Sequence, residues 1–337
     1  MFQKKSKIRK IVLKTSQVYH FQNHTYFLSV PTKLVICVWE VTRRVMLLPY
    51  LKTLKLEGSE VNLRQVLRRC RVESLSIRWV SSVSGLYDDK ICSSALKKLD
   101  CAGAELSDDE IPLILQKFHK LQYLDVRCTN FSGESMLLYN GSLSLKTLIC
   151  SYSDTSNEGL ISFLLWSEKL EHLEISENKA LNIDLVKIIQ IIPGLTFINA
   201  RMTSITAKSL KFYKGPQPVL QHLNLSYCNR LTDEDLLDIF NVIGNSLKYL
   251  NINYSDVTGR NLCEINGPLP CLETFLCGCT KFEDTGVRAL IEKTRSTLRN
   301  LGVFRTELTE GYREEIKQEF PSLILDRDYT VDELFEY

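Results

Sequence analysis

Apolar residues recur along almost the whole chain in one short pattern. In LQHLNLSYCNRLTDEDLLDIF, at residues 220–240, Leu220, Leu223 and Leu225 form one copy, with polar residues between them. Alternate residues of a strand point to opposite faces, so Leu223 and Leu225 face the same side. Further apolar residues follow at helical spacing, as at Leu236 and Phe240. Each copy therefore predicts a short strand with one buried face, then a turn and a helix.

The copies follow one another at a nearly constant period. Their first residues are Leu51, Val72, Leu96, Leu121, Leu145, Leu170, Leu195, Leu220, Leu247, Leu272 and Leu298, spaced 21 to 27 residues apart. An earlier copy begins at Ile8, 43 residues before Leu51, and we expect an insertion or an irregular repeat in between. One strand and one helix in about 20–29 residues is typical of leucine-rich repeats. The sequence thus predicts an α/β leucine-rich-repeat solenoid, a horseshoe with parallel strands on the concave face and helices on the convex face.

Three regions follow from the spacing of the copies. We expect residues 1–50 to form an irregular first repeat or N-terminal cap, residues 51–322 the repeats, and residues 323–337 a C-terminal cap and tail. In the last region Leu323 to Leu325 predicts a half-strand, before an acidic and aromatic tail. A polar cap suits the end of a repeat array, since the last core layer has no further neighbour.

A short polar residue or a cysteine stands three residues after the last apolar position of most copies. These ladder residues are Ser16, Ser59, Thr129, Ser153, Asn178, Thr203, Cys228, Ser255, Thr280 and Thr306. Only Val80 and Ala104 interrupt the series. Because the chain turns inward there, we expect these side chains to bond to backbone groups that water does not reach.

A second polar series predicts where the helices begin. Its members are Ser107, Ser132, Ser156, Thr206, Thr232, Thr258 and Thr309. Serine and threonine are favoured at helix N-caps, where the hydroxyl accepts a bond from a free backbone N–H. Ser107 with Glu110 matches a capping box, and Thr232 with Asp235 is close to one.

Composition and charge limit the classes of partner that we expect the protein to bind. The chain has 337 residues, 44% hydrophobic and 24% charged, with a net charge of +2, as in ordinary globular proteins. We therefore expect no nucleic-acid partner and no membrane partner, and no stretch of 18 apolar residues occurs. A local basic cluster lies at residues 4–10, which we interpret as a solvated edge. Eleven cysteines without a secretory signal indicate reduced thiols in the cytoplasm or nucleus.

The sequence offers no support for catalysis, a metal or a cofactor. Cys101, Cys150 and Cys277 occupy the third apolar position, so we expect them in the core. His172 and His222 hold the same strand position two repeats apart, about 10 Å, which is too far for one metal ion. Paired cysteine spacings typical of zinc sites and glycine-rich phosphate loops are both missing from the sequence. We therefore expect a non-enzymatic protein without cofactors.

Polar and aromatic residues on and just after the strands are the candidate binding residues. They are Trp79, Tyr123, Arg127, Tyr152, His172, Glu174, Phe197, Arg201, His222, Asn224, Tyr227, Tyr249, Asn251 and Tyr254. Exposed tyrosine, tryptophan and arginine are typical of protein interfaces. The alternative is that several of them pack sideways on neighbouring strands. We predict that the concave face binds a protein.

Particular stretches resemble one family. Repeats such as LNLSYCNRLTDEDL resemble the cysteine-containing repeats of F-box proteins and of mitotic-exit antagonist (Amn-type) proteins. KIRKIVLK, then a gap and KLVICVWEVTRRVMLLPYLKTLKL, expected to hold a helix, resembles the first irregular repeat after an F-box. LRNLGVFRTELTEGYREEIKQEFPSLILDRDY resembles the last repeat of S-phase-kinase-associated F-box proteins. The resemblance implies a substrate receptor of a Skp–cullin ubiquitin ligase.

The sequence leaves several functions open because no clear F-box is found in it. Only seven residues precede Ile8, and SVPTKLVICVWE at residues 29–40 has a faint F-box look. One expectation is a repeat region of a longer product whose upstream F-box binds a Skp-type adaptor. Another is an F-box-less scaffold or inhibitor that binds a regulatory protein, as the Amn-type resemblance implies. A subunit of a ciliary or mitochondrial assembly is a third interpretation, permitted by the fold alone.

Overall fold

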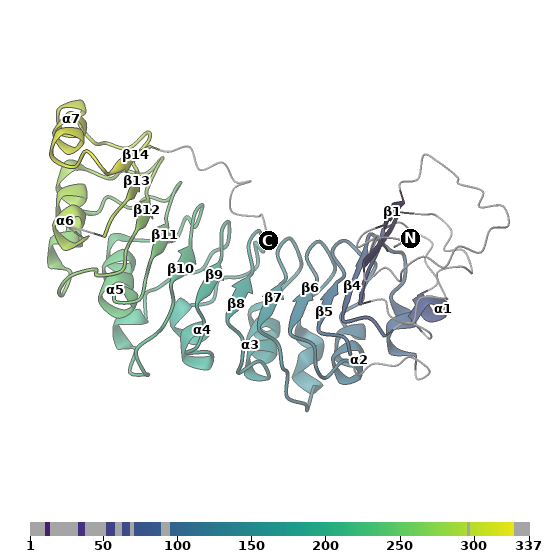
Figure 1. Cartoon of the computed structure of the whole chain (residues 1–337). Coiled ribbons are helices and arrows are strands. Elements are labelled where there is room, and N and C mark those ends of the chain that lie inside the picture. The colour runs from purple at the N-terminus through teal and green to yellow at the C-terminus, as the bar shows by residue number, and fades with distance from the viewer. Residues whose placement is uncertain are drawn as a thin grey trace, which may run out of the picture. The chain divides into compact units, whose positions relative to one another are not determined.

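The computed structural model describes residues 11–13, 33–37, 52–57, 63–67, 71–88, 95–294 and 297–326. The chain divides into two compact units, Met1–Leu170 and Glu171–Tyr337. Each unit repeats a strand and a helical segment, with the elements labelled in Figure 1. The predicted basic cluster, the ladder residues Ser16 and Ser59, and the tail after residue 326 lie outside the described residues.

In the first unit, parallel strands pair in the order in which they occur along the chain. They are β1 (Ile11–Leu13), β2 (Lys33–Cys37), β3 (Thr53–Glu57), β4 (Ser74–Arg78), β5 (Lys98–Asp100), β6 (Tyr123–Asp125) and β7 (Thr147–Ile149). Its helical segments are α1 (Leu63–Leu67), η2 (Ser84–Tyr87), α2 (Glu110–Lys117), η3 (Glu134–Leu138) and α3 (Asn157–Leu165). The predicted core positions Leu75, Leu99 and Leu124 lie opposite one another and are buried.

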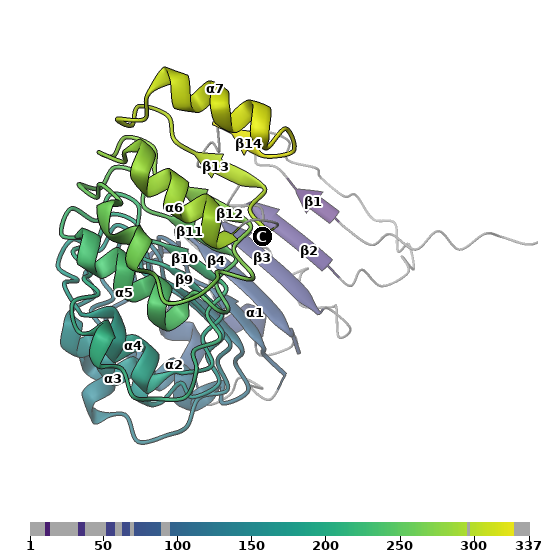
Figure 2. The ribbon, with the colours of Figure 1, turned by 90° about the vertical axis from the view of Figure 1, so that its left-hand side faces the viewer.

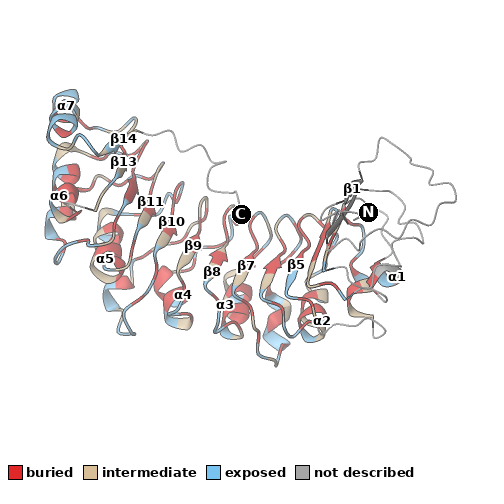
Figure 3. Ribbon diagram, in the orientation of Figure 1, coloured by how far each residue is buried: buried red, intermediate tan, exposed pale blue. Residues whose placement is uncertain are grey.

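The second unit has the same plan. Its parallel strands are β8 (His172–Glu174), β9 (Phe197–Asn199), β10 (His222–Asn224), β11 (Tyr249–Asn251), β12 (Thr274–Leu276), β13 (Asn300–Gly302) and β14 (Ile324–Leu325). Its helical segments are α4 (Leu185–Ile191), η4 (Leu210–Phe212), α5 (Asp233–Ile243), η5 (Arg260–Glu264), α6 (Asp284–Thr294) and α7 (Glu310–Glu319). Within the unit the helical segments lie on one side of the strands (Figure 2). Buried residues fill the space between the two layers (Figure 3). The predicted α/β leucine-rich-repeat solenoid is confirmed.

The long first interval holds an extra strand. Lys33–Cys37 form β2, which pairs with both β1 and β3, so an irregular repeat fills part of the gap between Ile8 and Leu51. The helix expected in this stretch is therefore wrong at residues 33–37, and these residues of the segment that resembled an F-box form a strand instead. Val35, Ile36 and Cys37 are β-branched or small apolar residues, which favour a strand.

The ladder residues act as predicted, mostly within their own repeat. Thr129 Oγ1 donates to the carbonyl of Val126 at 2.6 Å, and Asn178 Nδ2 donates to Ile175 at 3.0 Å. The same bond to the third residue before it is made by Ser153, Thr203, Ser255, Thr280 and Thr306. Cys228 differs, because its Sγ donates to the carbonyl of Ala200 in the preceding repeat at 3.3 Å. A thiol therefore serves here as a weak backbone donor, and the core positions of Cys101, Cys150 and Cys277 are also confirmed.

Only some of the predicted helix starts carry α-helices. Thr232 and Asp235 form a complete capping box on α5, and Ser156 and Thr309 cap α3 and α7. Ser132, Thr206 and Thr258 precede only the short 3-10 turns η3, η4 and η5. The capping box of Ser107 is half formed, since Ser107 donates to Glu110 but α2 starts after Asp109 without a side-chain cap. In these repeats the covering layer is therefore thinner than predicted.

Aspartates at the starts of α2, α4, α5 and α6 tie their repeats to the next. Asp108 accepts hydrogen bonds from the backbone N–H groups of Ser132, Gly133 and Ser135 at 3.0, 2.8 and 2.7 Å. In the same way Asp184 reaches Ser209, Asp233 reaches Thr258 and Gly259, and Asp284 reaches Thr309. We call these four residues the aspartate clamps. Asp108, Asp184 and Asp233 satisfy N–H groups of turns that precede only short 3-10 segments, whereas Asp284 bonds to the N-cap residue of α7.

The hydrogen bonds that Asp108 accepts change the pKa of its carboxyl. Burial raises the pKa of the Asp108 carboxyl, but the hydrogen bonds from Ser135, Gly133 and Ser132 outweigh burial, so the pKa lies below its ordinary value. A carboxyl with a lowered pKa stabilises the fold above its unfolded-state pKa. That stabilisation is lost as the pH falls through the folded-state pKa.

We expect Asp108→Ala to lower the free energy of unfolding by about 1–2 kcal/mol, as loss of a capping group does. Asp109→Ala, on the exposed neighbour, is the matched control and should cost only a few tenths of that. Urea unfolding at pH 7 measures both, and at pH 3 the difference between the variants should shrink because unfolding then allows the Asp108 carboxyl to bind a proton. Equal stability of the two variants at pH 7 would show that Asp108 is not a clamp.

Candidate partner-binding site

The first unit presents paired charges on its strand face. Arg78 pairs with Asp100 at 2.8 Å, and Arg127 holds Asp125 in a bond of 2.7 Å. The ammonium of Lys98 lies 3.8 Å from the ring centre of Tyr123, a cation–π contact. Of the predicted site residues here, Tyr123 thus contacts Lys98 on the neighbouring strand, and Arg127 contacts Asp125 of its own repeat.

Trp79 and Tyr152 are the most exposed predicted residues of the first unit. Their side chains are 62% and 57% exposed. A Cβ at Gly103 would lie 2.3 Å from the ring of Trp79, so the indole lies directly over that glycine. One face of the indole is therefore packed and the rest reaches solvent. Tyr152 has the same place in its repeat, two residues after the last apolar position.

In the second unit four predicted residues form a continuous stack, which we call the inner ring row. The rings of His172, Phe197, His222 and Tyr249 follow one another on four neighbouring strands at centroid distances of 3.8, 4.2 and 4.0 Å. His172 Nε2 also lies 2.9 Å from Glu174 Oε1. The two histidines predicted to be too far apart for one metal are separated by the ring of Phe197. Both histidine rings stack on neighbouring rings, and all four residues of the row are half-buried.

A second set of rings, the outer ring row, follows the ends of the strands. The rings of Tyr227 and Tyr254 stack at 4.1 Å, and Phe304 meets Tyr254 edge-on at 6.4 Å. Arg201 pairs with Glu177 and lies over the Tyr227 ring at 4.9 Å. Hydrogen bonds with Cys279 and Tyr227 raise the pKa of Tyr254 to about 12. Tyr227 and Tyr254 remain exposed.

Between the two ring rows lies a row of asparagines. Asn199, Asn224 and Asn251 are opposite one another in register and are only 4%, 3% and 6% exposed. The Oδ1 atom of each accepts the backbone N–H two residues later, at 3.2, 3.0 and 2.9 Å. The predicted residues Asn224 and Asn251 are thus part of the turn that ends the strand, with little surface of their own.

The exposed side chains after the strands sit on an unusual backbone. Residues with positive φ occur once per repeat, at Trp79, Cys128, Tyr152, Glu177, Met202, Tyr227, Tyr254, Cys279, Arg305 and Asp326. Among the turns that the structure describes, only the one at Gly103 holds this position with a glycine, which adopts the left-handed region without steric cost. A side chain with a Cβ costs about 1–2 kcal/mol there. Several large side chains therefore occupy a backbone conformation in which glycine would cost less free energy.

Sequence reasoning missed several members of this surface. Glu177 and Phe304 complete the contacts of Arg201 and Tyr254, and Lys98 covers Tyr123. Burial lowers the pKa of Lys98, attraction to Asp100 opposes this, and repulsion by Lys55 adds to it. All three missed residues stand at the strand or turn positions that supplied the predicted ones, so the repeat frame already contained the signal.

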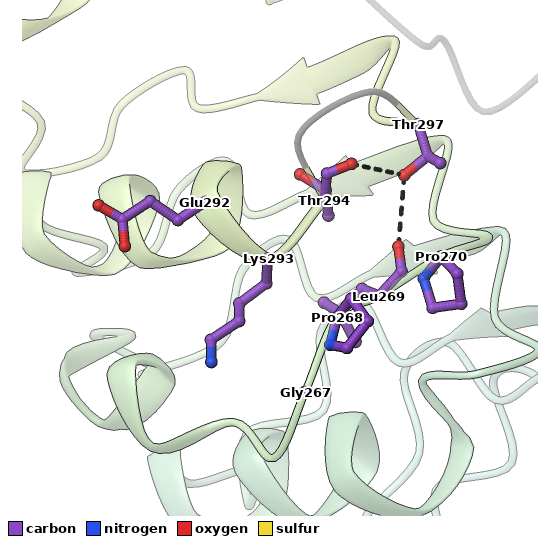
Figure 4. A pocket seen from close by; sticks show the side chains of 8 residues that line it. All are labelled: Gly267, Pro268, Leu269, Pro270, Glu292, Lys293, Thr294 and Thr297. Carbon is purple, nitrogen blue, oxygen red and sulfur yellow. Dashed lines mark hydrogen bonds between the residues drawn. The ribbon is translucent and has the colours of Figure 1, made fainter.

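A separate pocket lies beside the C-terminal end of α6. It has a volume of about 530 Å³ and is lined by the loop Gly267–Pro270 together with Glu292, Lys293, Thr294 and Thr297 (Figure 4). Lys293 Nζ donates to the carbonyl of Ile265 at 2.7 Å, and Thr297 Oγ1 donates to the carbonyl of Leu269 at 3.3 Å. Lys293 and Thr297 therefore hold the loop against the helix.

Metal-binding and membrane-spanning features can be judged for the described part of the chain. There, no group of three or more histidine, cysteine, aspartate or glutamate side chains could hold a metal ion. No helix in that part has the length and apolar composition needed to span a bilayer.

Comparisons with known proteins agree with the repeat fold. The family description "Leucine Rich repeat" matches residues 217–240, the stretch with Leu220, Cys228 and Thr232. A comparison with curated sequences found no match. Among solved structures, yeast Rad7 in its complex with Elc1 has a TM-score of 0.61 and 18% identity, over 89% of this chain and 80% of that one. We conclude that the chain has the leucine-rich-repeat fold.

Two bacterial structures share the fold. An internalin, InlF, from Listeria monocytogenes has a TM-score of 0.51 and 16% identity, over 90% of this chain and 88% of that one. The functional domain of InlJ from the same organism, described as including a cysteine ladder, has a TM-score of 0.51 and 14% identity, over 83% and 59% of the two chains. Identities this low show the fold alone.

His222, half-buried in the inner ring row, makes stability depend on pH. Burial, and to a lesser degree repulsion by His172, lower the pKa of His222 to about 3. Unfolding frees the imidazole to bind a proton at its ordinary pKa of about 6.5. Between these two values the unfolded state binds more protons, so stability falls as the pH drops below about 6.5.

We expect wild-type protein to lose up to about 2 kcal/mol of unfolding free energy from His222 between pH 7 and pH 5. His222→Phe keeps a ring between Phe197 and Tyr249 and should remove this contribution. His119→Gln, on an exposed residue after α2, is the control and should leave the pH dependence as it is. Urea unfolding at both pH values measures it, and an unchanged slope in His222→Phe would contradict the assignment.

Proposed function

We propose that the strand face of the second unit, with its inner and outer ring rows, binds a protein partner. Leucine-rich-repeat proteins generally serve as protein-binding modules, and no arrangement of side chains among the described residues points to a catalytic group. The observation that carries the proposal is the left-handed turn residue. Tyr227 and Tyr254 hold conformations that cost free energy, yet remain exposed. Strain kept at exposed aromatic residues points to a role outside the fold.

The partner-facing set then follows from exposure. Tyr227, Tyr254 and Arg201 of the outer ring row offer the aromatic and guanidinium groups that dominate interface energies. The ring edges of His172, Phe197, His222 and Tyr249 add to the surface. Asn224 and Asn251 contribute through the small area left between the rows. In the first unit Trp79, Tyr152, Tyr123 and Arg127 supply a further set on the strand face.

We propose more specifically that the protein is a substrate receptor of a Skp–cullin type ubiquitin ligase. The support is the resemblance of the repeats, and of the last repeat above all, to those of F-box proteins. Such a receptor works in the cytoplasm or nucleus, where thiols stay reduced, and the described cysteines are free thiols. Purified Skp-type adaptor mixed with the full-length gene product tests this role. A stable complex is expected, and none forming would leave a binding protein without a ligase.

A scaffold or inhibitor that binds a regulatory protein without a ligase is the second candidate. One observation favours it, because residues 33–37 form strand β2 in the segment that had looked like an F-box. Under both candidates the strand face holds the partner. The two are separated by the adaptor experiment above.

We expect Tyr227→Ala combined with Tyr254→Ala to weaken partner binding by about 30-fold or more, the effect of losing interface hot spots. Phe212→Ala, which removes an exposed ring on η4 in the helical layer, is the control. Tagged wild-type and variant proteins recovered from cells and compared by quantitative mass spectrometry identify proteins that only the double variant loses. Binding of purified partner is then measured by calorimetry. Equal affinity for the wild type and the double variant would refute the strand-face site.

A further inference from the structure

Exposed leucines gather on the helical layer of the first unit. Leu113 of α2, Leu137 of η3 and Leu165 of α3 are 45% to 63% exposed, and Leu138 of η3 is 92% exposed. In the other helical segments that the structure describes, Phe212 is the only large apolar side chain with comparable exposure. We call the four leucines the leucine patch. Contiguous apolar groups on the surface of a soluble protein are typical of contact surfaces.

The leucines belong to one patch because the elements that carry them are in contact. The segment η3 contacts both α2 and α3, and these two helices lie on the same side of the strands (Figure 1). The rings of Tyr139 and Trp166, which directly follow Leu138 and Leu165 in the chain, meet edge-on at 5.9 Å. At the other end of η3, the clamp residue Asp108 holds the preceding turn beside the start of α2. The patch is therefore fixed in place by the fold.

Acidic and basic side chains flank the leucine patch on opposite sides. Glu134 and Glu158 are exposed in the first turns of η3 and α3. Lys120 and Lys169 are exposed in the connections that follow α2 and α3. Within the part of the chain that the structure describes, none of these four residues forms an ion pair. This order of charge suits the helix dipole, but the dipole does not account for the exposed leucines between the charges.

We infer that the leucine patch binds the leucine patch of a second copy of this chain, with α2, η3 and α3 antiparallel to the same elements of the partner copy. In a symmetric dimer both copies contribute the same surface. A two-fold axis that crosses these elements at right angles reverses their direction. Glu158 of one copy then faces the partner's Lys169, and the leucines of the two copies meet in the middle.

The order of charges selects this arrangement. An axis parallel to the elements would bring Glu158 against the partner's Glu158, and facing like charges are unfavourable. An unrelated protein would need an apolar centre with basic and acidic groups in the reverse order on its two sides, and a second copy already has them. The contact uses the helical layer, so the inference does not rest on the proposed function of the strand face.

Sedimentation velocity with the full-length protein tests the inference, at concentrations from about 1 μM to about 200 μM. The wild type should show a monomer–dimer equilibrium. Leu137→Ser combined with Leu138→Ser should weaken association at least tenfold and leave the circular dichroism spectrum unchanged, because both side chains are exposed. Phe212→Ser, which removes an equally exposed ring from η4 in the second unit, is the matched control and should dimerise as the wild type does.

Exchange of the charges tests the antiparallel arrangement. Glu134→Lys with Glu158→Lys leaves lysines on both sides of the patch, and Lys120→Glu with Lys169→Glu leaves acids on both sides. Each double variant alone should associate at least tenfold more weakly than the wild type, whereas an equal mixture of the two should form heterodimers. Glu234→Lys, in the first turn of α5, is the control and should leave dimerisation unchanged.

Three results would overturn the inference. They are a wild type that stays monomeric at all concentrations, a leucine double variant that dimerises as the wild type does, and a mixture of charge variants that associates no better than either variant alone. The tyrosine double variant of the outer ring row leaves the leucine patch intact and should still dimerise. The dimer and the strand-face function can therefore fail independently of each other.

Discussion

The turn that ends each strand is the constraint on which the other features depend. Its backbone passes through the left-handed region at one residue and is then closed by a side-chain bond such as that from Thr203 to the Ala200 carbonyl. The turn also takes up the strand's last polar side chain, as Asn224 accepts the N–H of Ser226. Without this closure the chain could not leave a three-residue strand and return to the helical layer with its buried polar groups satisfied. The turn therefore sets the register of every strand with the next.

This register also creates the candidate site. Because equivalent residues lie about 4.8 Å apart on neighbouring strands, aromatic rings at one position must stack face to face, as His222 and Tyr249 do. Stacking leaves the ring edges for contact and hides the faces. The same spacing forces the asparagines into a row between the rings. A surface built by repetition is thus continuous along the strands, and its chemistry changes only where a single repeat changes its residue.

The sequence alone predicted the features that depend on the spacing of apolar residues. It did not predict the features that depend on contacts between neighbouring repeats. The frame around Leu220, Leu223 and Leu225 located strands, core and ladder, because apolar spacing determines which face is buried. The strand β2 was not predicted, because residues 33–37 lack the full apolar spacing of the frame. The thin turns at η3 and η5 follow from Gly133 and Gly259, whose positive φ no pattern of caps reveals. The burial of Asn224 results from rings on either side of it, which lie in other positions of the frame and in other repeats.

The aspartate clamps have a consequence for how such a chain grows and shrinks. Asp108, Asp184 and Asp233 each belong to an α-helical repeat and complete the short turn of the repeat after it. The smallest segment that holds both partners of one clamp is therefore a pair of repeats. Loss of either repeat of such a pair separates a donor loop from its carboxylate. A clamp is kept intact only when about fifty residues, twice the length of one leucine-rich repeat, are gained or lost together.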